Sequence, residues 1–374
     1  MSEKKIKAMI AETFLSVADA LETGEYGKTP VIGFASEGSE HGRENIEEAV
    51  RLAADKGLKT VLIEGDDVHG KMEKMLSSGE IDGAVTMHYP FPVGVSTVGK
   101  VVTPGKGKAM YLATTTGTSD TDRVAGMVKN AIYGIIAAKA EGNNAPTVGI
   151  ANIDGARQVE RALLKLKENG YDICFAESAR ADGGIVMRGN DLLSATSDIM
   201  VMDSLTGNLM VKIFSAYSTG GNYESLGFGY GPGIGPDFDK LIMIVSRASG
   251  APVIAGAVEF ATNLVKHDWK KIAKDEFAKA NKAGFQEIIK EIKNAGKKNE
   301  GGAADEEVKA PPKEVCTEQI PGIEVMDLED AVKVLWKAGI YAESGMGCTG
   351  PIVMMAAGKK EQSFEILKAA GYVG

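Results

Sequence analysis

Short runs of apolar and β-branched residues alternate along the chain with longer segments in which apolar residues recur every three or four positions. The first short runs cover residues 31–35, 60–64 and 83–88, and a helical pattern over residues 44–56 separates the first two. Alternating strands and helices are typical of βαβ units, in which parallel strands form a sheet covered by helices. The sequence therefore predicts an α/β fold, a parallel-sheet α/β/α structure.

This pattern continues in two lobes and a tail. A helical pattern that ends near residue 141 is followed by Gly142-Asn-Asn-Ala-Pro146, which stops a helix, and a second series of strands and helices then begins. Near residue 300 a run of charged residues, glycine and proline is typical of a flexible linker. We expect an N-terminal α/β lobe, a second α/β lobe, the linker and a small helical tail over residues 1–145, 146–297, 298–314 and 315–374.

Composition and charge exclude several classes of function. The 374 residues are 44% apolar and 25% charged, as in a folded globular protein. A net charge of −9 has the wrong sign for a nucleic-acid partner, and no apolar run reaches the ~20 residues of a membrane span. Three cysteines and four scattered histidines suit neither a disulfide framework nor a metal site. We expect a cytoplasmic protein without a metal, a membrane or a nucleic acid as partner.

The strongest chemical signal lies in the tail, in the sequence Ser344-Gly-Met-Gly-Cys-Thr-Gly-Pro351. Glycines allow a close backbone approach and proline is favoured in the first turn of a helix, so we expect Cys348 just ahead of a helix over residues 351–370. A helix N-terminus lowers the pKa of a thiol and favours a nucleophilic thiolate. The alternative is a small cysteine buried in a tight turn, and the residues alone leave both interpretations open.

Hydroxyl and basic side chains cluster where predicted strands end. Such loops at the carboxyl ends of parallel strands bind ligands in open α/β sheets, and their amides and hydroxyls suit an oxyanion. Ordinary helix capping and a solvated arginine are the competing interpretations. The candidate phosphate-binding residues are Thr118, Arg123, Thr206, Gly207, Asn208, Ser246 and Arg247.

The order of these motifs resembles a known family. Residues 148–152, residues 198–208 and the Ser246-Arg247 pair are similar to the strand ends of phosphate acetyltransferases and of the acyl-carrier phosphate acyltransferases of phospholipid synthesis. The resemblance covers about residues 30–265. Thr118-x-Asp120-x-x-Arg123 also resembles the loop with which phosphotransacetylases hold substrate phosphate and coenzyme A. The resemblance implies an acyltransferase with a two-lobed fold and a phosphate site.

The tail extends the resemblance to nearly the whole chain. Gly347-Cys348-Thr349-Gly350 after a charged linker resembles the alpha subunits of component C of the clostridial glycine, sarcosine and betaine reductases. This resemblance implies that Cys348 is the reactive cysteine. It also implies a hetero-oligomer with two partners, a ketoacyl-synthase-like beta subunit and a selenoprotein A that carries the carboxymethyl group.

One departure from the phosphotransacetylases shapes the expected reaction. Those enzymes place an acidic residue after the Ser-Arg pair to deprotonate coenzyme A, whereas residues 248–252 supply none. A thioester on the protein's own Cys348 needs no such base. We expect orthophosphate, the co-substrate, to attack an acetyl thioester on Cys348 and release acetyl phosphate, with no further cofactor and with the amides of Gly347 to Gly350 holding the oxyanion. The alternatives are a stand-alone phosphate acyltransferase that uses acyl-carrier or coenzyme A thioesters, and a non-enzymatic scaffold.

Overall fold

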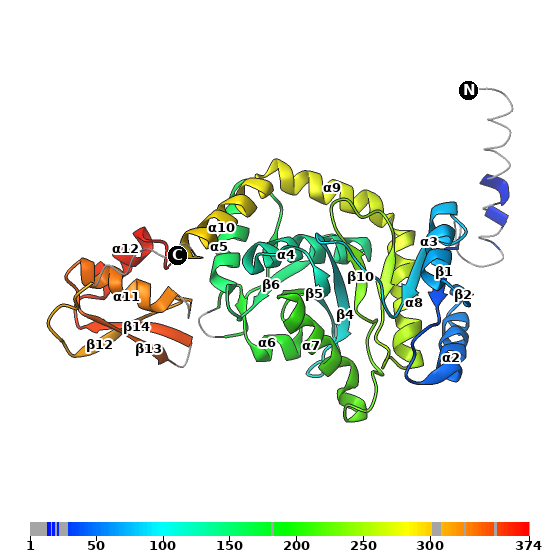
Figure 1. Ribbon diagram of the computed structural model, residues 1–374, viewed down its shortest axis with the longest axis horizontal. Helices are drawn as coiled ribbons and strands as arrows, with labels where there is room; N and C mark the ends of the chain where they lie inside the picture. The colour runs from blue at the N-terminus through cyan, green and yellow to red at the C-terminus, as the bar shows by residue number, and fades with distance from the viewer. Residues whose placement is uncertain are drawn as a thin grey trace, which may run out of the picture.

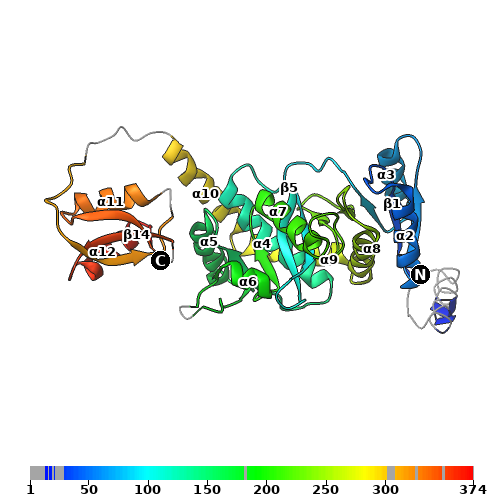
Figure 2. The same ribbon diagram turned by 90° about the horizontal axis from the view of Figure 1, so that it is seen from below.

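The computed structural model consists of a large body followed by a smaller tail unit (Figure 1). It describes residues 13–15, 17–18, 21, 29–180, 183–300, 308–324, 327–347 and 350–373. Seen from below, the tail lies beyond the end of the body's last helix (Figure 2). Within the described residues, no helix is long and apolar enough to cross a membrane.

A sheet of eleven described strands forms the centre of the body. Its strands are β1 (Val31–Ala35), β2 (Lys59–Ile63), β3 (Gly83–Thr86), β4 (Val95–Val102), β5 (Ala109–Thr118), β6 (Thr147–Ala151), β7 (Cys174–Phe175), β8 (Val186–Met187), β9 (Ile199–Val201), β10 (Gly231–Ile234) and β11 (Ile242–Ile244). They are ordered β2-β1-β3-β11-β10-β4-β5-β9-β6-β7, with β8 also pairing with β6. All pairs are parallel except β4 with β5, β4 with β10 and β10 with β11. The predicted α/β fold with a largely parallel sheet is confirmed.

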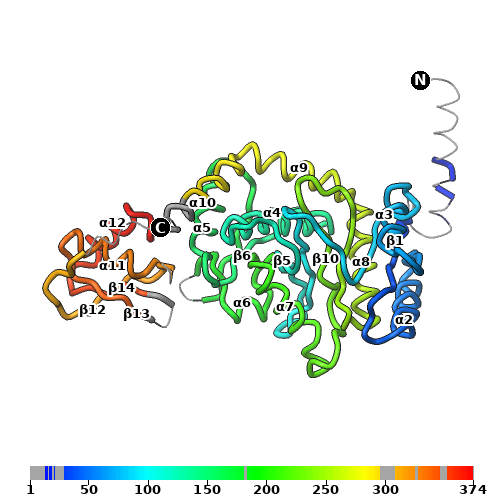
Figure 3. The backbone as a smooth tube through the Cα atoms, viewed as in Figure 1, coloured from blue at the N-terminus to red at the C-terminus, as the bar shows by residue number. Residues whose placement is uncertain are grey.

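Helices cover both faces of this sheet. They are α2 (Gly42–Asp55), α3 (Val68–Ser78), α4 (Arg123–Ala140), α5 (Ala156–Glu168), α6 (Gly189–Ser194), α7 (Ser204–Ala216), α8 (Ala251–Lys266), α9 (Trp269–Lys282) and α10 (Phe285–Glu300), with a 3-10 turn η1 at Tyr217–Thr219. Helix α4 is buried along nearly its whole length, and α9 and α10 run outside it along one side of the body (Figure 3). Small residues make this possible, because any Cβ at Gly134 would press against Ile199 of β9.

The sheet does not divide where the predicted lobes meet. Strands β10 and β11 follow residue 145 in sequence, yet they lie between β3 and β4. Strand β10 joins the two parts, since Gly231 and Pro232 pair with β11 whereas Gly233 and Ile234 pair with β4. The lobe boundaries themselves stay a prediction. Three antiparallel pairs separate β11 from β5, so these two strands run in opposite directions and their carboxyl ends lie at opposite edges of the sheet.

The tail combines helices with a sheet that the sequence analysis did not predict. Strands β12 (Cys316–Pro321), β13 (Ala342–Gly347) and β14 (Gly350–Ala356) form an antiparallel sheet in the order β12-β14-β13. Helices α11 (Leu328–Lys337) and α12 (Lys360–Ala369) pack against it. The helix predicted over residues 351–370 is therefore wrong in its first part. The β-branched Ile352 and Val353 are buried in this sheet, and strand pairing prevails over the helix-start signal of Pro351.

Candidate functional site

Arg123 joins three strand ends at the carboxyl edge of the sheet. It is the first residue of α4, which a loop of four residues connects to β5. Its guanidinium donates to Asp154 beyond β6 at 2.8 Å and to Asp203 beyond β9 at 3.0 Å. The side chain is still 44% exposed. The structure thus brings Arg123 to the same edge as the 203–208 segment, as the sequence pattern predicted, and leaves part of the guanidinium able to meet a ligand.

The three candidates at the start of α7 mainly position that helix. The Thr206 amide and hydroxyl both donate to the carboxylate of Asp203, at 3.0 and 2.8 Å, which caps the helix. The Asn208 side-chain amide donates to the carbonyl of Thr115 in β5 at 3.1 Å. A Cβ at Gly207 would overlap the carbonyl oxygen of Thr114, so glycine allows α7 to lie directly on β5. Capping, the alternative weighed from the sequence, accounts for these contacts.

The remaining candidates lie at the ends of two other segments, with Ser246 and Arg247 at the edge of the sheet opposite to Arg123. Ser246 and Arg247 follow β11, which β10 and β4 separate from β5. The hydroxyl of Ser246 accepts the Ala248 amide at 3.1 Å, and the carbonyl of Arg247 accepts the Glu40 amide at 2.9 Å. Thr118 ends β5 with an exposed side chain and a carbonyl that accepts the Gly94 amide at 2.8 Å. The candidates therefore form two groups, one around Arg123 and one around Ser246.

Helix α7 connects the two groups, and at its far end it does so through residues that no sequence motif indicated. Its first turn contacts Arg123 through Asp203, and two turns later the Lys212 ammonium lies 3.4 Å from the Ser246 hydroxyl. The same ammonium lies 3.4 Å from the carboxylate of Glu224, which is 3% exposed. Burial and the neighbouring Glu224 carboxylate raise the pKa of Tyr230, whose hydroxyl donates a hydrogen bond to Glu224. Only the fold brings these residues together.

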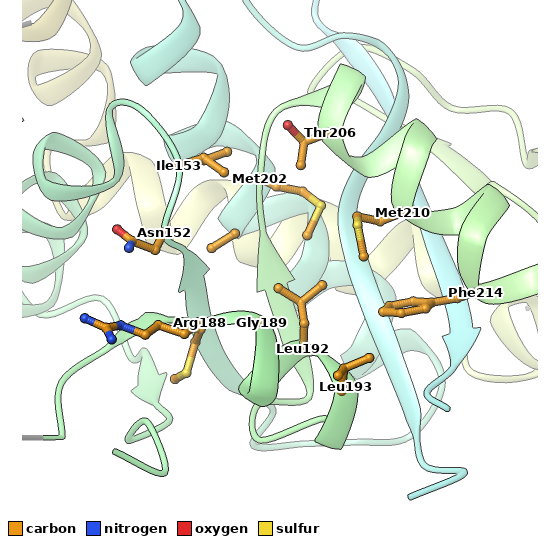
Figure 4. Close-up of a pocket in the computed structure, with 12 residues that line it drawn as sticks. Asn152, Ile153, Arg188, Gly189, Leu192, Leu193, Met202, Thr206, Met210 and Phe214 are labelled. Atoms are coloured by element: carbon orange, nitrogen blue, oxygen red, sulfur yellow. The ribbon is translucent and has the colours of Figure 1, made fainter. Parts of the chain in front are cut away.

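An apolar cavity adjoins the Arg123 group. It has a volume of about 680 Å³ and lies between α6 and α7, at the ends of β6, β8 and β9 (Figure 4). Methionine, leucine and phenylalanine make up half of the lining residues, and methionine adapts readily to the shape of an apolar ligand. Its lining includes the polar residues Asn152, Arg188 and Thr206. The cavity has room for an apolar group beside the candidate phosphate site.

The tail contacts the body beside Arg123. Glu324 precedes α11, and its carboxylate accepts the backbone amides of Gly155 at 3.1 Å and Arg157 at 2.7 Å. These amides belong to the start of α5, where a carboxylate is favoured by the helix dipole. Since α5 begins just after Asp154, the partner of Arg123, the tail docks at the candidate site.

Asp120 fixes the loop between β5 and α4 through buried ion pairs. Its side chain is 2% exposed and pairs with Lys129 at 2.7 Å and Lys293 at 2.8 Å. Burial alone would raise the pKa of Asp120, but hydrogen bonds from the two lysines hold it at about 2. The carboxylate therefore stabilises the fold above the ordinary aspartate pKa, and this contribution is lost as the pH falls from about 4 to about 2.

We expect Asp120→Asn to lower the free energy of unfolding at pH 7 by about 3 kcal/mol, because it leaves two partly buried lysines without their partner. The difference from wild type should shrink below pH 4, as the wild-type carboxyl takes up its proton. Urea denaturation at pH 7 and at pH 3 measures both values. Asp330→Asn, which removes an exposed carboxylate, is the control and should change little. A difference that stays constant between the two pH values would contradict this role.

The reactive-cysteine prediction concerns a residue that the structure does not describe. Cys348 and Thr349 lie outside the described residues, between Gly347 and Gly350, which pair as the last residues of β13 and the first of β14. Because β14 is a strand, the prediction that Cys348 precedes a helix is wrong, and a helix dipole is no basis for a low thiol pKa. Of the described cysteines, Cys316 has a pKa raised by burial and by the carboxylates of Glu343 and Glu314.

Comparison with known proteins gives the family. The model of a family described as fatty acid synthesis protein matches residues 18–354. The chain is also 56% identical, over 384 aligned positions, to the glycine/sarcosine/betaine reductase complex component C subunit alpha of Peptoclostridium acidaminophilum. That alignment covers 98% of this chain and 99% of the relative. The resemblance found in the sequence is confirmed, and the chain belongs to the fatty acid synthesis protein family.

Proposed function

We propose that the chain is the alpha subunit of component C in a reductase complex for glycine, sarcosine or betaine, where it forms acetyl phosphate. The observation that carries this proposal is the 56% identity with the component C subunit alpha over 98% of this chain. The docking of the tail through Glu324 beside Arg123 supports it, because the segment with Cys348 belongs to that tail. In Figure 1 the paired ends of β13 and β14 lie on the side of the tail that faces the body.

In the proposed reaction, an oxygen of orthophosphate attacks the carbonyl carbon of an acetyl thioester on Cys348. The carbon–sulfur bond of the tetrahedral intermediate then breaks, which gives acetyl phosphate and the Cys348 thiolate. The phosphate-binding residues in this proposal are Thr118 and Arg123 at one end of α7 and Ser246 and Arg247 at the other, and the arginines offset phosphate charge while they orient the attacking oxygen. Backbone amides of Gly347, Thr349 and Gly350 stabilise the oxyanion. No cofactor beyond the co-substrate orthophosphate takes part.

The partners in this proposal are a ketoacyl-synthase-like beta subunit and a selenoprotein A that delivers the carboxymethyl group, in a cytoplasmic hetero-oligomer. One observation favours a second function, a stand-alone phosphate acyltransferase. The cavity of about 680 Å³ is larger than an acetyl group requires, so that a longer acyl group of an acyl-carrier or coenzyme A thioester would fit there. A saturable dependence of turnover on coenzyme A distinguishes this alternative.

The test runs the proposed reaction in reverse, from acetyl phosphate to an acetyl thioester on Cys348. The purified chain is mixed with acetyl phosphate, quenched in acid and digested, and acetylated peptides are located by mass spectrometry. We expect an acetyl group on Cys348 that hydroxylamine removes, as for a thioester. Cys348→Ala should abolish the adduct and Cys316→Ala should leave it unchanged. Turnover that requires coenzyme A, without an adduct on Cys348, would contradict the proposal.

A further inference from the structure

Three segments of the chain meet at the Ser246 end of the candidate site. Lys212 lies on α7, Glu224 lies between η1 and β10, and Ser246 follows β11. The ammonium of Lys212 is 3.4 Å from both the Ser246 hydroxyl and a Glu224 carboxylate oxygen. The Lys212 side chain is 50% exposed, whereas Glu224 is almost fully buried. The cluster thus presents a cation to solvent and keeps its anion inside.

Glu224 is tied to the Ser246 loop by both its backbone and its side chain. Its amide donates to the Ala248 carbonyl at 3.1 Å, and its own carbonyl accepts the Gly250 amide at 2.8 Å. Its carboxylate accepts the hydroxyl of Ser249 at 2.8 Å, and the Ser249 oxygen accepts the amide of Ser246 at 3.0 Å. A change at Glu224 therefore reaches Ser246 through one intervening side chain.

The chemistry of Lys212 leaves it able to bind an anion. An ammonium has three N–H donors, and two of them are directed at Glu224 and Ser246. The third can donate to a ligand because the side chain is half-exposed. The ammonium also lies 5.6 Å from the centre of the Tyr230 ring, which limits where it can move.

We propose that Lys212 is a phosphate-binding residue at the Ser246 end of the site, and that Glu224 is the positioning residue that holds the ammonium and the Ser246 loop together. This inference rests on the proposed function, in which Ser246 contacts orthophosphate. Glu224 stands beside the Ser246-Arg247 pair, where residues 248–252 supply no acidic side chain. It acts on the cation that binds phosphate rather than on an acyl-carrier thiol.

The experiment measures binding of orthophosphate to the full-length protein by isothermal titration calorimetry. We expect Lys212→Gln to weaken binding by about 30-fold, the effect of one charge-assisted hydrogen bond, and Lys212→Arg to recover most of the loss. Glu224→Gln should weaken binding about fivefold, and should add nothing when Lys212 is already glutamine. Lys56→Gln is the matched control, because Lys56 is also half-exposed and paired with a glutamate, Glu259. Its phosphate affinity should equal that of wild type.

Lys212→Gln binding within twofold of wild type would overturn the assignment of Lys212, as would the absence of saturable binding in the wild type. The positioning role would be overturned if Glu224→Gln lowered only the melting temperature. It would also be overturned if the losses of phosphate affinity in Glu224→Gln and Lys212→Gln multiplied in the double variant. The acetyl adduct on Cys348 separates these failures from failure of the proposed function. An adduct with unchanged phosphate affinity in Lys212→Gln rejects only the present inference, and weakened affinity without an adduct rejects only the thioester.

Discussion

Removal of residues 315–374 is expected to lower acetyl phosphate formation in the reconstituted complex by at least about a thousandfold, because an acyl group tethered near its acceptor reacts at a high effective concentration. The tail carries Cys348, and Glu324 docks it at the start of α5 beside Arg123. Without the tail, phosphate bound to the body has no thioester to attack.

The shortened chain should stay folded. The hydrophobic core of the tail contains only tail residues, from Ile320 to Val373, and the cores of the body contain none of them. Loss of the Glu324 cap should cost about 1 kcal/mol of stability, which thermal denaturation measures. Full-length Cys348→Ala is the matched control, with the same loss of turnover and an unchanged melting temperature. If the shortened chain kept its turnover, the tail could not be the acyl carrier.

Much of the body could be predicted from the sequence because its strands have strong local signals. The apolar runs at residues 31–35, 60–64 and 83–88 became β1, β2 and β3 with small changes at their ends. The order of the sheet could not be predicted, since β10 and β11 have three or four residues each and their places between β3 and β4 depend on pairing across long stretches of chain.

The candidate site could be predicted only for residues that belong to a sequence motif. Arg123 and the 203–208 segment meet as the strand-end rule requires. Lys212 and Glu224 have no motif, and the contact of Glu224 with Ser249 joins segments that only the folded sheet brings together. In the tail, Pro351 suggested a helix start, whereas pairing of Ile352 and Val353 with β13 made a strand. The role of Cys348 stays a prediction.

The second large effect is expected from Gly207→Ala. Helix α7 reaches both groups of site residues, through Asp203 at its start and Lys212 further along. It can do so because Gly207 lies against the Thr114 carbonyl of β5, where a methyl group would overlap the oxygen. The added methyl must push α7 away from the sheet. We expect a loss of about 3 kcal/mol in the free energy of unfolding, the upper range for overpacking.

The same shift should reduce turnover more than a surface substitution that lowers the free energy of unfolding by the same amount. Displacement of α7 by about 1 Å moves Lys212 from Ser246 and Asp203 from Arg123, and misplacement on that scale lowers rates by about a hundredfold. Urea denaturation measures the stability of the variant, the rate of acetyl phosphate formation in the reconstituted complex measures its turnover, and phosphate titration measures its affinity. Gly189→Ala is the control, because a Cβ at Gly189 in α6 meets no atom within 4 Å, so its stability should stay within about 0.5 kcal/mol of wild type. Wild-type stability and phosphate affinity in Gly207→Ala would show that contact between α7 and β5 does not set the site.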